Sequence, residues 1–294
     1  MNNSERNQAE FLVIIVNWNT LELLKGCLEA LEAVKKSINF DVLVVDNGSK
    51  DGSAEMLKQD YLNCKLILND KNLGFGKANN LGLKQYPDYP FYLLLNSDTL
   101  VNTKTISKML SVAKSNPRIA AVNPSLILPS GDLQTGGAGF GPGLLSSFNT
   151  FTGLSKLSPI FKGLYIEQKH YLKNTKELSV DWVALACTLI SRKVLEDIGL
   201  LDEIFFVYGE DSEWCWRAKK KGWEFVYLPN LNITHFLGGS TEDKAQLNSK
   251  WFEALSLSVK LQGTRKDFYG FIIMGFFGYS FRYLILQIWN VFSA

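Results

Sequence analysis

The sequence predicts an α/β fold in which helices flank a mainly parallel central sheet. Over the first 125 residues, apolar runs of strand length alternate with segments of helical periodicity, which is the pattern of βαβ units. Polar residues follow these runs, as they do where the strands of an open α/β sheet end beside a ligand crevice. The 294 residues can bury a substantial core, so we expect one large domain with an appendage.

The predicted strands of the first half are short and strongly apolar. Between the first two, Leu21, Leu24, Leu28 and Leu31 recur at helical spacing after Thr20, a predicted N-cap. The predicted strands span residues 11–16, 41–45, 65–68, 91–95 and 119–122.

The second half is less regular. Residues 129–180 are rich in glycine, serine and proline, and predict a long, partly mobile loop that is either a functional lid or a disordered insertion. Order returns at 180–191, a strand pair or one long strand. A short helix, an acidic segment, strands at 224–229 and near 233–240, and a helix over 241–261 complete the globular part.

Composition excludes several classes of protein. The formal net charge of +2 gives no reason to expect a nucleic-acid partner. The four cysteines are widely spaced and only two histidines occur, so neither a zinc knuckle nor a disulfide framework is indicated and a reducing cytoplasm is expected. The polar residues 1–10 lack the apolar core of a signal peptide, so export is not expected.

Four polar clusters fall at predicted strand ends, over residues 16–19, 45–53, 69–82 and 96–98. Asp46 follows an apolar strand and precedes Gly48, so its carboxylate can face the crevice and accept hydrogen bonds from a base or ribose. The alternative is an ordinary turn in which Asp46 and Asn47 cap the next helix.

The third cluster combines flexible backbone with amide and ammonium donors, which suits a diphosphate near a helix start. A purely structural turn is the alternative. Its residues are Asn72, Gly74, Gly76, Lys77, Asn79 and Asn80.

The fourth cluster places Asn96 and Asp98 after the most apolar strand. Magnesium and manganese prefer oxygen ligands, and magnesium often takes only one or two carboxylates, so Asp98 is a candidate metal ligand. It could instead cap a helix that begins near Thr103. His235 follows a later predicted strand and is either a neutral ligand to the same cation or a structural histidine.

An acidic segment, 209–217, places Glu210, Asp211 and Glu213 beside Trp214 and Arg217. If a helix begins near Asp211, its positive end favours the ionised carboxylates, and Asp211 is then available as a general base. The alternative is a solvated acidic helix start.

In this order, the segments resemble family 2 glycosyltransferases, especially a rhamnosyltransferase-like branch. The resemblance covers about residues 11–240 and rests on VNWN, VVDNGSKDGS, NLGFGKANNLG, LLLNSDT, IGLLDEIFFVYGEDSEWCWRAKKKGW and THFLGGS. It implies a GT-A (nucleotide-diphospho-sugar transferase) fold, a nucleotide-sugar donor, a divalent cation (Mg²⁺ or Mn²⁺) and inversion at the anomeric carbon. Where the family often has Asp-x-Asp, this chain has Asn96-Ser97-Asp98.

The resemblance also implies a role for each matching residue. Asp211 would be the catalytic base, with Glu210 orienting or contacting the acceptor. Asp98 would bind the metal, with His235 as a further ligand. The nucleotide-sugar pocket would hold Asn17, Asn19, Asp46, Asn72, Lys77, Asn79 and Asn96, and the acceptor would contact Trp182, Glu210 and Arg217.

The chain is expected to divide into a catalytic domain, 1–265, and an apolar C-terminal helical tail, 266–294. The tail has a single charge after position 267, Arg282, and follows the basic Arg265 and Lys266. It predicts a shallow or re-entrant membrane-associated helix, with a core-packing or homodimerisation helix as the alternative.

The expected reaction moves a sugar, rhamnose-like, onto a saccharide or polyprenyl-linked acceptor at the inner face of the cell membrane. Two rivals remain: a binding protein that has lost catalysis, and a nucleotidyltransferase. Intact Asp98 and Asp211 oppose the first, and the absence of a basic glycine-rich loop after the first strand opposes the second.

Overall fold

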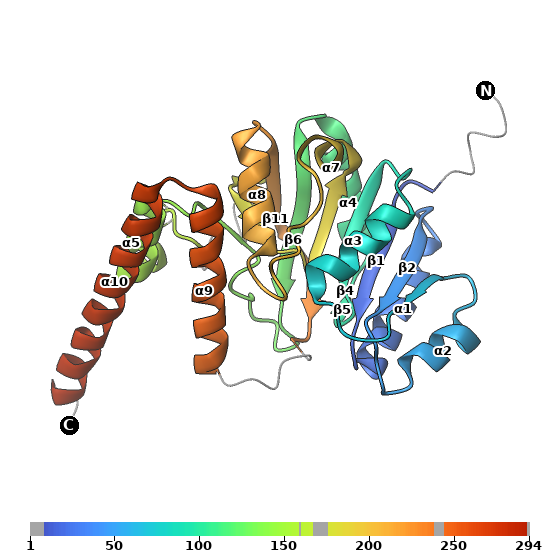
Figure 1. Cartoon of the computed structure of the whole chain (residues 1–294), viewed down its shortest axis with the longest axis horizontal. Helices are drawn as coiled ribbons and strands as arrows, with labels where there is room; N and C mark the ends of the chain where they lie inside the picture. The colour runs from blue at the N-terminus through green and yellow to red at the C-terminus, as the bar shows by residue number, and fades with distance from the viewer. Residues whose placement is uncertain (1–8, 159, 167–175, 238–243, 293–294) are drawn as a thin grey trace.

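The computed structural model describes residues 9–158, 160–166, 176–237 and 244–292 (Figure 1). The polar N-terminal residues 1–8 and the predicted helix start at 241–243 lie outside the described residues.

The predicted α/β fold is confirmed. Within the described residues, nine strands form one sheet in the order β3-β2-β1-β4-β10-β6-β11-β5, with β8 paired to β11. The strands β3, β2, β1 and β4 are mutually parallel, whereas β10 runs antiparallel to both β4 and β6. The strands are β1 (Leu12–Asn17), β2 (Asp41–Asp46), β3 (Lys65–Leu68), β4 (Phe91–Asn96), β5 (Thr99–Leu100), β6 (Ile119–Ile127), β7 (Ala138–Gly139), β8 (Leu178–Val180), β9 (Trp182–Val183), β10 (Cys187–Ser191) and β11 (Glu224–His235).

Helices cover both faces of this sheet (Figure 1). They are α1 (Leu21–Lys35), α2 (Ser53–Asp60), α3 (Phe75–Gln85), α4 (Thr103–Ser115), α5 (Leu144–Thr152), the 3₁₀ helix η2 (Leu154–Lys156), α7 (Arg192–Ile198), α8 (Glu210–Lys220), α9 (Lys244–Gln262) and α10 (Arg265–Phe292).

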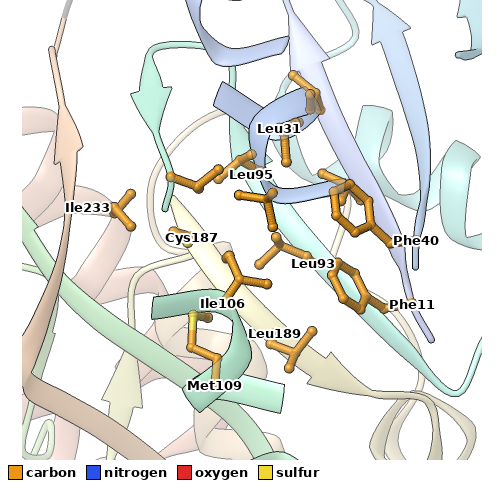
Figure 2. Close-up of a cluster of buried hydrophobic side chains, with 14 of the residues drawn as sticks. Phe11, Leu31, Phe40, Leu93, Leu95, Ile106, Met109, Cys187, Leu189 and Ile233 are labelled. Atoms are coloured by element: carbon orange, nitrogen blue, oxygen red, sulfur yellow. The ribbon is translucent and has the colours of Figure 1, made fainter. Parts of the chain in front are cut away.

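Alternation along β1 divides the interior into two cores. Val13 and Ile15 point to the face covered by α1, α2 and α4, and Figure 2 shows part of this cluster, with Leu31 from α1 and Met109 from α4. Leu12 and Ile14 point to the opposite face, which is covered by α3, α7 and α8. Both faces are buried, which explains why the strands are apolar throughout rather than alternating.

Thr20 is the N-cap residue of α1, as predicted, but its side chain does not cap the helix. Thr20 makes no side-chain cap bond, and its hydroxyl instead donates to Asn17 Oδ1 at 2.6 Å. Asp51, from the next loop, accepts from the Leu21 amide at 2.8 Å, so a residue remote in sequence satisfies the helix start.

The prediction of one long loop over 129–180 was wrong. This segment contains β7, α5, η2 and β8, and β7 pairs with β9. Its side chains Phe151 and Leu164 pack with Leu255, Val259 and Phe271 of the C-terminal helices in a third core. Burial against distant helices, rather than local propensity, orders the segment.

The predicted strands at 224–229 and near 233–240 are joined as a single strand, β11, which ends at His235, and residues 238–240 of the second prediction lie outside the described residues. Irregular pairing between Leu228 and Asn232 interrupts the ladder without ending the strand. The apolar tail is helical as predicted: α10 packs on α5 and α9 at the end of the molecule opposite α2 (Figure 1). Within the described part of the chain, no helix is long and apolar enough to span a membrane.

We predict that Gly139→Ala destabilises the fold by about 1–3 kcal/mol, the usual cost of overpacking. A Cβ at Gly139 would lie 1.7 Å from the Leu164 carbonyl oxygen, which also accepts from Trp182 Nε1. Urea unfolding measures the loss. Gly137→Ala is the matched control because its Cβ would meet only Leu126 at 3.7 Å, an ordinary contact. Equal stability of the two variants would contradict the packing described.

Candidate active site

The ends of β1 and β2 are joined by buried polar side chains. Asn17 Nδ2 donates to Asp46 Oδ1 at 2.9 Å and to Ser49 Oγ at 3.1 Å, and Asp46 Oδ2 accepts from the Ser49 amide at 3.0 Å. Asn17 and Asp46 are both buried. These contacts make the pair a brace for the loops after both strands. They also show that Asp46 does not cap α2, which begins at Ser53 and whose N-cap residue, Gly52, makes no side-chain cap bond.

Asn19 joins the same two loops from the exposed side. Its amide donates to Ser49 Oγ at 2.9 Å, its Oδ1 accepts from the Lys50 amide at 2.8 Å, and its backbone φ is 53°. Asparagine tolerates this left-handed conformation better than most residues. Between Asn17 and Asn19, Trp18 is 48% exposed, a large aromatic surface at the end of β1 that sequence reasoning missed.

Asn72 lies at the start of α3 as part of a second network. Its Oδ1 accepts from Asn47 Nδ2 at 2.8 Å and from the Gly74 amide at 2.9 Å. Asn47 Oδ1 in turn accepts from Asn69 Nδ2 and the Leu73 amide. Asn47, which the sequence suggested only as a possible cap, is therefore the centre of this turn.

The start of α3 is covered rather than open. The Phe75 amide donates to the Phe206 carbonyl at 3.0 Å, and a Cβ on Gly74 would lie 2.5 Å from that oxygen. Asn79 is buried, and its Nδ2 donates to the Phe75 carbonyl. The half-exposed Lys77, whose Nζ lies 3.9 Å from Glu203, is the group of this helix that can reach an anionic ligand.

Asp98, Asn96 and His235 meet at the end of β4. His235 Nε2 lies 3.1 Å from Asp98 Oδ1 and 3.3 Å from Asn96 Nδ2. The pairing of Thr99 in β5 with His235 in β11 brings them together. Asp98 does not cap α4, because Asn102 does so by accepting from the Thr105 amide.

Gln134 orients the imidazole. Its Oε1 lies 2.7 Å from His235 Nδ1; in the tautomer in which Nδ1 donates to this oxygen, the Nε2 lone pair faces Asp98. Two electron-rich atoms at 3.1 Å repel each other unless a proton or a cation lies between them. A ligating histidine commonly donates its other N–H to a carbonyl in this way, so the donor set fits a divalent cation.

The described residues contain no cluster of three or more His, Cys, Asp and Glu side chains for a metal ion. Asp98 and His235 would supply two protein ligands to such a cation and leave its other positions for a diphosphate and water.

Glu210 and Asp211 open α8 as predicted, directly after the left-handed Tyr208 and Gly209. Burial, and then the neighbouring Asp211 charge, raise the pKa of Glu210 to about 8. Its Oε2 is buried and has no hydrogen-bond partner among the described residues. Burial also raises the pKa of Asp211, against bonds to Oδ1 from the Ser212 amide and hydroxyl.

Two predicted acceptor contacts have structural partners instead. Arg217 pairs with the buried Glu213 through Nε and Nη2 at 2.7 and 2.8 Å, and donates to the Ile198 and Leu200 carbonyls. Trp182 is buried and donates to the Leu164 carbonyl at 2.9 Å. These contacts hold both side chains within the fold, and acceptor contact by Arg217 and Trp182 stays a prediction.

We predict that Glu210→Gln changes stability in a pH-dependent way. Because the folded pKa of Glu210 lies above its ordinary value, the folded state binds the proton more tightly than the unfolded state, and stability falls as pH rises toward 8. The variant has no carboxyl group to ionise at this position. Its melting temperature, compared with that of wild type, should therefore rise as the pH is raised from 6 to 9. Glu213→Gln is the control, because it removes the carboxylate that pairs with Arg217 and should lower the melting temperature at pH 6 and at pH 9 alike. A constant difference between Glu210→Gln and wild type would contradict the burial.

Two curated proteins that are similar in sequence to this chain are named as sugar transferases. An N-acetylglucosaminyl-diphospho-decaprenol L-rhamnosyltransferase of Mycobacterium tuberculosis is 26% identical over 210 residues, covering 68% of this chain and 67% of that protein. The low-salt glycan biosynthesis hexosyltransferase Agl10 of Haloferax volcanii is 28% identical over 242 residues, covering 81% of this chain and 70% of that protein.

Solved structures share the fold at low identity. GalNAc-T7 with UDP, GalNAc and Mn²⁺ superposes with a TM-score of 0.61 at 14% identity, covering 86% of this chain. This chain spans about half of that structure, 48%. The mannosyltransferase PcManGT of Pyrobaculum calidifontis, in complex with GDP-Man and Mn²⁺, gives 0.56 at 16% identity, covering 86% of this chain and 64% of that one. The fold is the GT-A fold that the resemblance implied.

The family model "Glycosyl transferase family 2" matches residues 12–199, which is more than half of the chain and includes the ends of β1, β2 and β4. This chain belongs to glycosyl transferase family 2.

Proposed function

We propose that this glycosyltransferase moves a rhamnose-like sugar, with inversion and with a divalent cation, from a nucleotide-diphosphate donor to a saccharide or lipid-linked acceptor at a membrane surface. The observation that carries the proposal is the meeting of Asp98 with the oriented His235 at the end of β4. The activities named for the two curated relatives support a hexose or deoxyhexose donor.

The nucleotide would bind over the loops after β1 and β2. Asn17 and Asp46 brace these loops, Asn19 joins them, and the exposed Trp18 offers an aromatic face to the base. Stacking on an aromatic side chain suits any nucleobase, because each has a π-face. Lys77, half exposed at the start of α3, would supply positive charge for the diphosphate.

Asp98 and His235 would hold the cation, with Asn96 beside them and Gln134 keeping the Nε2 lone pair directed inward. When bound, the cation would offset the negative charge that develops on the departing nucleoside diphosphate.

Asp211 would accept the proton of the attacking hydroxyl. Its raised pKa makes it a stronger base than an exposed aspartate, and the adjacent Glu210, neutral near pH 7, places no competing charge beside it. The hydroxyl attacks the face of the sugar opposite the leaving group, so a single base without a protein nucleophile inverts the anomeric centre, by analogy with inverting glycosidases.

We predict that Asp98→Ala weakens cation-dependent binding of nucleoside diphosphate at least about tenfold, within the range for lost ligands and their supports. Calorimetry with UDP, GDP and dTDP, with and without Mn²⁺, measures the effect. Asp88→Ala is the control, because this exposed aspartate lies at the opposite end of β4. If wild type and Asp98→Ala bind equally with and without Mn²⁺, Asp98 does not hold the cation.

We predict that Asp211→Asn lowers turnover by ~10²-fold or more, while donor binding persists, because the amide keeps the shape but cannot take the proton. In wild type, kcat should fall as pH drops below the raised pKa of Asp211, since the base must be ionised. This acidic limb should be absent from the residual activity of the variant. Near-normal turnover would remove Asp211 from the reaction.

A further inference from the structure

The helices α5 and α10 approach each other through small residues. A Cβ on Gly270 would lie 2.1 Å from Leu144 Cδ2, and one on Gly278 would lie 2.1 Å from Phe151 Cβ and 2.9 Å from its backbone. The positions advance together, 270 to 278 and 144 to 151, so the helices run parallel. Glycine is required at Gly278, where the neighbouring atoms include backbone that cannot move aside.

Large apolar side chains lie on the outside of this helix pair. On α10 the exposed apolar positions follow helical spacing and form a single stripe. On α5, Leu145 and Phe148 are exposed, and Leu144 is half exposed where it packs on Gly270. We call these six side chains the α5–α10 surface: Leu145, Phe148, Tyr269, Ile273, Phe276 and Phe277. Leu145 is 72% exposed and Phe276 is 69% exposed.

The helix pair buries Phe151 and Phe271 against each other and still leaves these six large apolar side chains exposed to water. Small residues between helices and large apolar side chains outside are typical of helices that face lipid. A contiguous apolar surface of this kind marks an interaction site.

The charges around the surface favour an anionic partner. Residues 138–166 contain Lys156 and Lys162 and no acidic residue. Residues 264–292 contain Arg265, Lys266 and Arg282 against the single acid Asp267. Asp267 is engaged locally, since its Oδ2 accepts from the Thr264 amide and hydroxyl at the start of α10. Basic residues beside an apolar helix face are attracted to anionic lipid headgroups.

We propose that α5 and α10 together form a docking surface that lies in the headgroup region of an anionic lipid membrane. At ~1.5 Å per residue, the 28 residues of α10 form a rod of about 42 Å. The exposed stripe on one side of α10 and the basic residues beside it favour a helix pair that lies along the interface, with the stripe toward the acyl chains.

The placement of the surface suits a lipid-linked acceptor, and in this respect the inference rests on the proposed function. In Figure 1, β1 enters from the side of the N-terminus and α10 runs in the same general direction. The second half of α10 therefore extends toward the side of the molecule on which β1 ends. A membrane that runs along α10 would place an embedded acceptor on this side.

Vesicle flotation of the full chain tests the proposal, with phosphatidylcholine vesicles that contain or lack phosphatidylglycerol. Leu145→Ser/Phe148→Ser on α5 and Phe276→Ser/Phe277→Ser on α10 should each lower partitioning at least tenfold, because burial of one large apolar side chain alone corresponds to about that factor. Lys156→Gln/Lys162→Gln should lose about tenfold of the preference for phosphatidylglycerol. Leu62→Ser/Leu68→Ser, which removes exposed leucines near α2, is the matched control and should float like wild type.

The outcomes separate the alternatives. If the α5 pair floats like wild type while the α10 pair does not, the joint surface is wrong and the tail acts alone. If the α5 pair dissociates a dimer in analytical ultracentrifugation and vesicle binding is unchanged, a second copy covers the surface. Melting temperature checks folding, and Leu145→Ser alone replaces the α5 pair if that pair does not fold. Binding of UDP, GDP and dTDP is measured on the same samples. If the wild-type chain floats with the vesicles but binds none of these nucleotides, the proposed function is overturned and this inference stands.

Discussion

The pairing of β11 with the rest of the sheet is the constraint on which the candidate site depends. β11 runs parallel to β6, antiparallel to β8, and meets β5 at its last two residues, Thr234 and His235. This register carries His235 across 137 positions of sequence to within 3.1 Å of Asp98. A shift by one residue would turn the imidazole to the other face, because side chains alternate along a strand.

The C-terminal helices support the start of α8. Ser258 Oγ of α9 donates to the Gly209 carbonyl at 3.0 Å, and Gln262 Nε2 donates to Glu213 Oε1 at 2.7 Å. A Cβ on Gly209 would lie 3.0 Å from that of Ala254, so α9 packs directly against the turn that precedes Asp211. Because α10 also packs on α9, the same helix contacts both the proposed lipid-docking surface and the segment that carries the proposed base, Asp211.

Local sequence patterns predicted most secondary structure of the first half of the chain. They failed where contacts between remote residues determine the structure. Local patterns predicted the strands that end at Asn17, Asp46 and Asn96 and the leucine-rich α1. Short apolar runs and helical spacing of leucines are signals that can be read from neighbouring residues alone. The segment 129–180 was not, because its apolar side chains are buried against remote elements: Phe140 and Ile166 enter the core beside α3, α7 and α8, and Phe151 and Leu164 pack against α9 and α10. Gln134 was missed for the same reason: it lies in that segment, and no local pattern indicates that its amide meets His235.

The sequence by itself determined the α/β class, the polar strand ends, the acidic start of α8 and the resemblance to the glycosyltransferase family, since all of these depend on residues close together in the chain. Only the tertiary structure decided which polar side chains are free to act. It directed Arg217 to Glu213 and Trp182 to the Leu164 carbonyl, buried Asn17 and Asp46 as a brace, and joined Asp98 to His235. The physical reason is that a polar group buried during folding must find a hydrogen-bond partner, and the nearest partner in space is set by packing between remote elements.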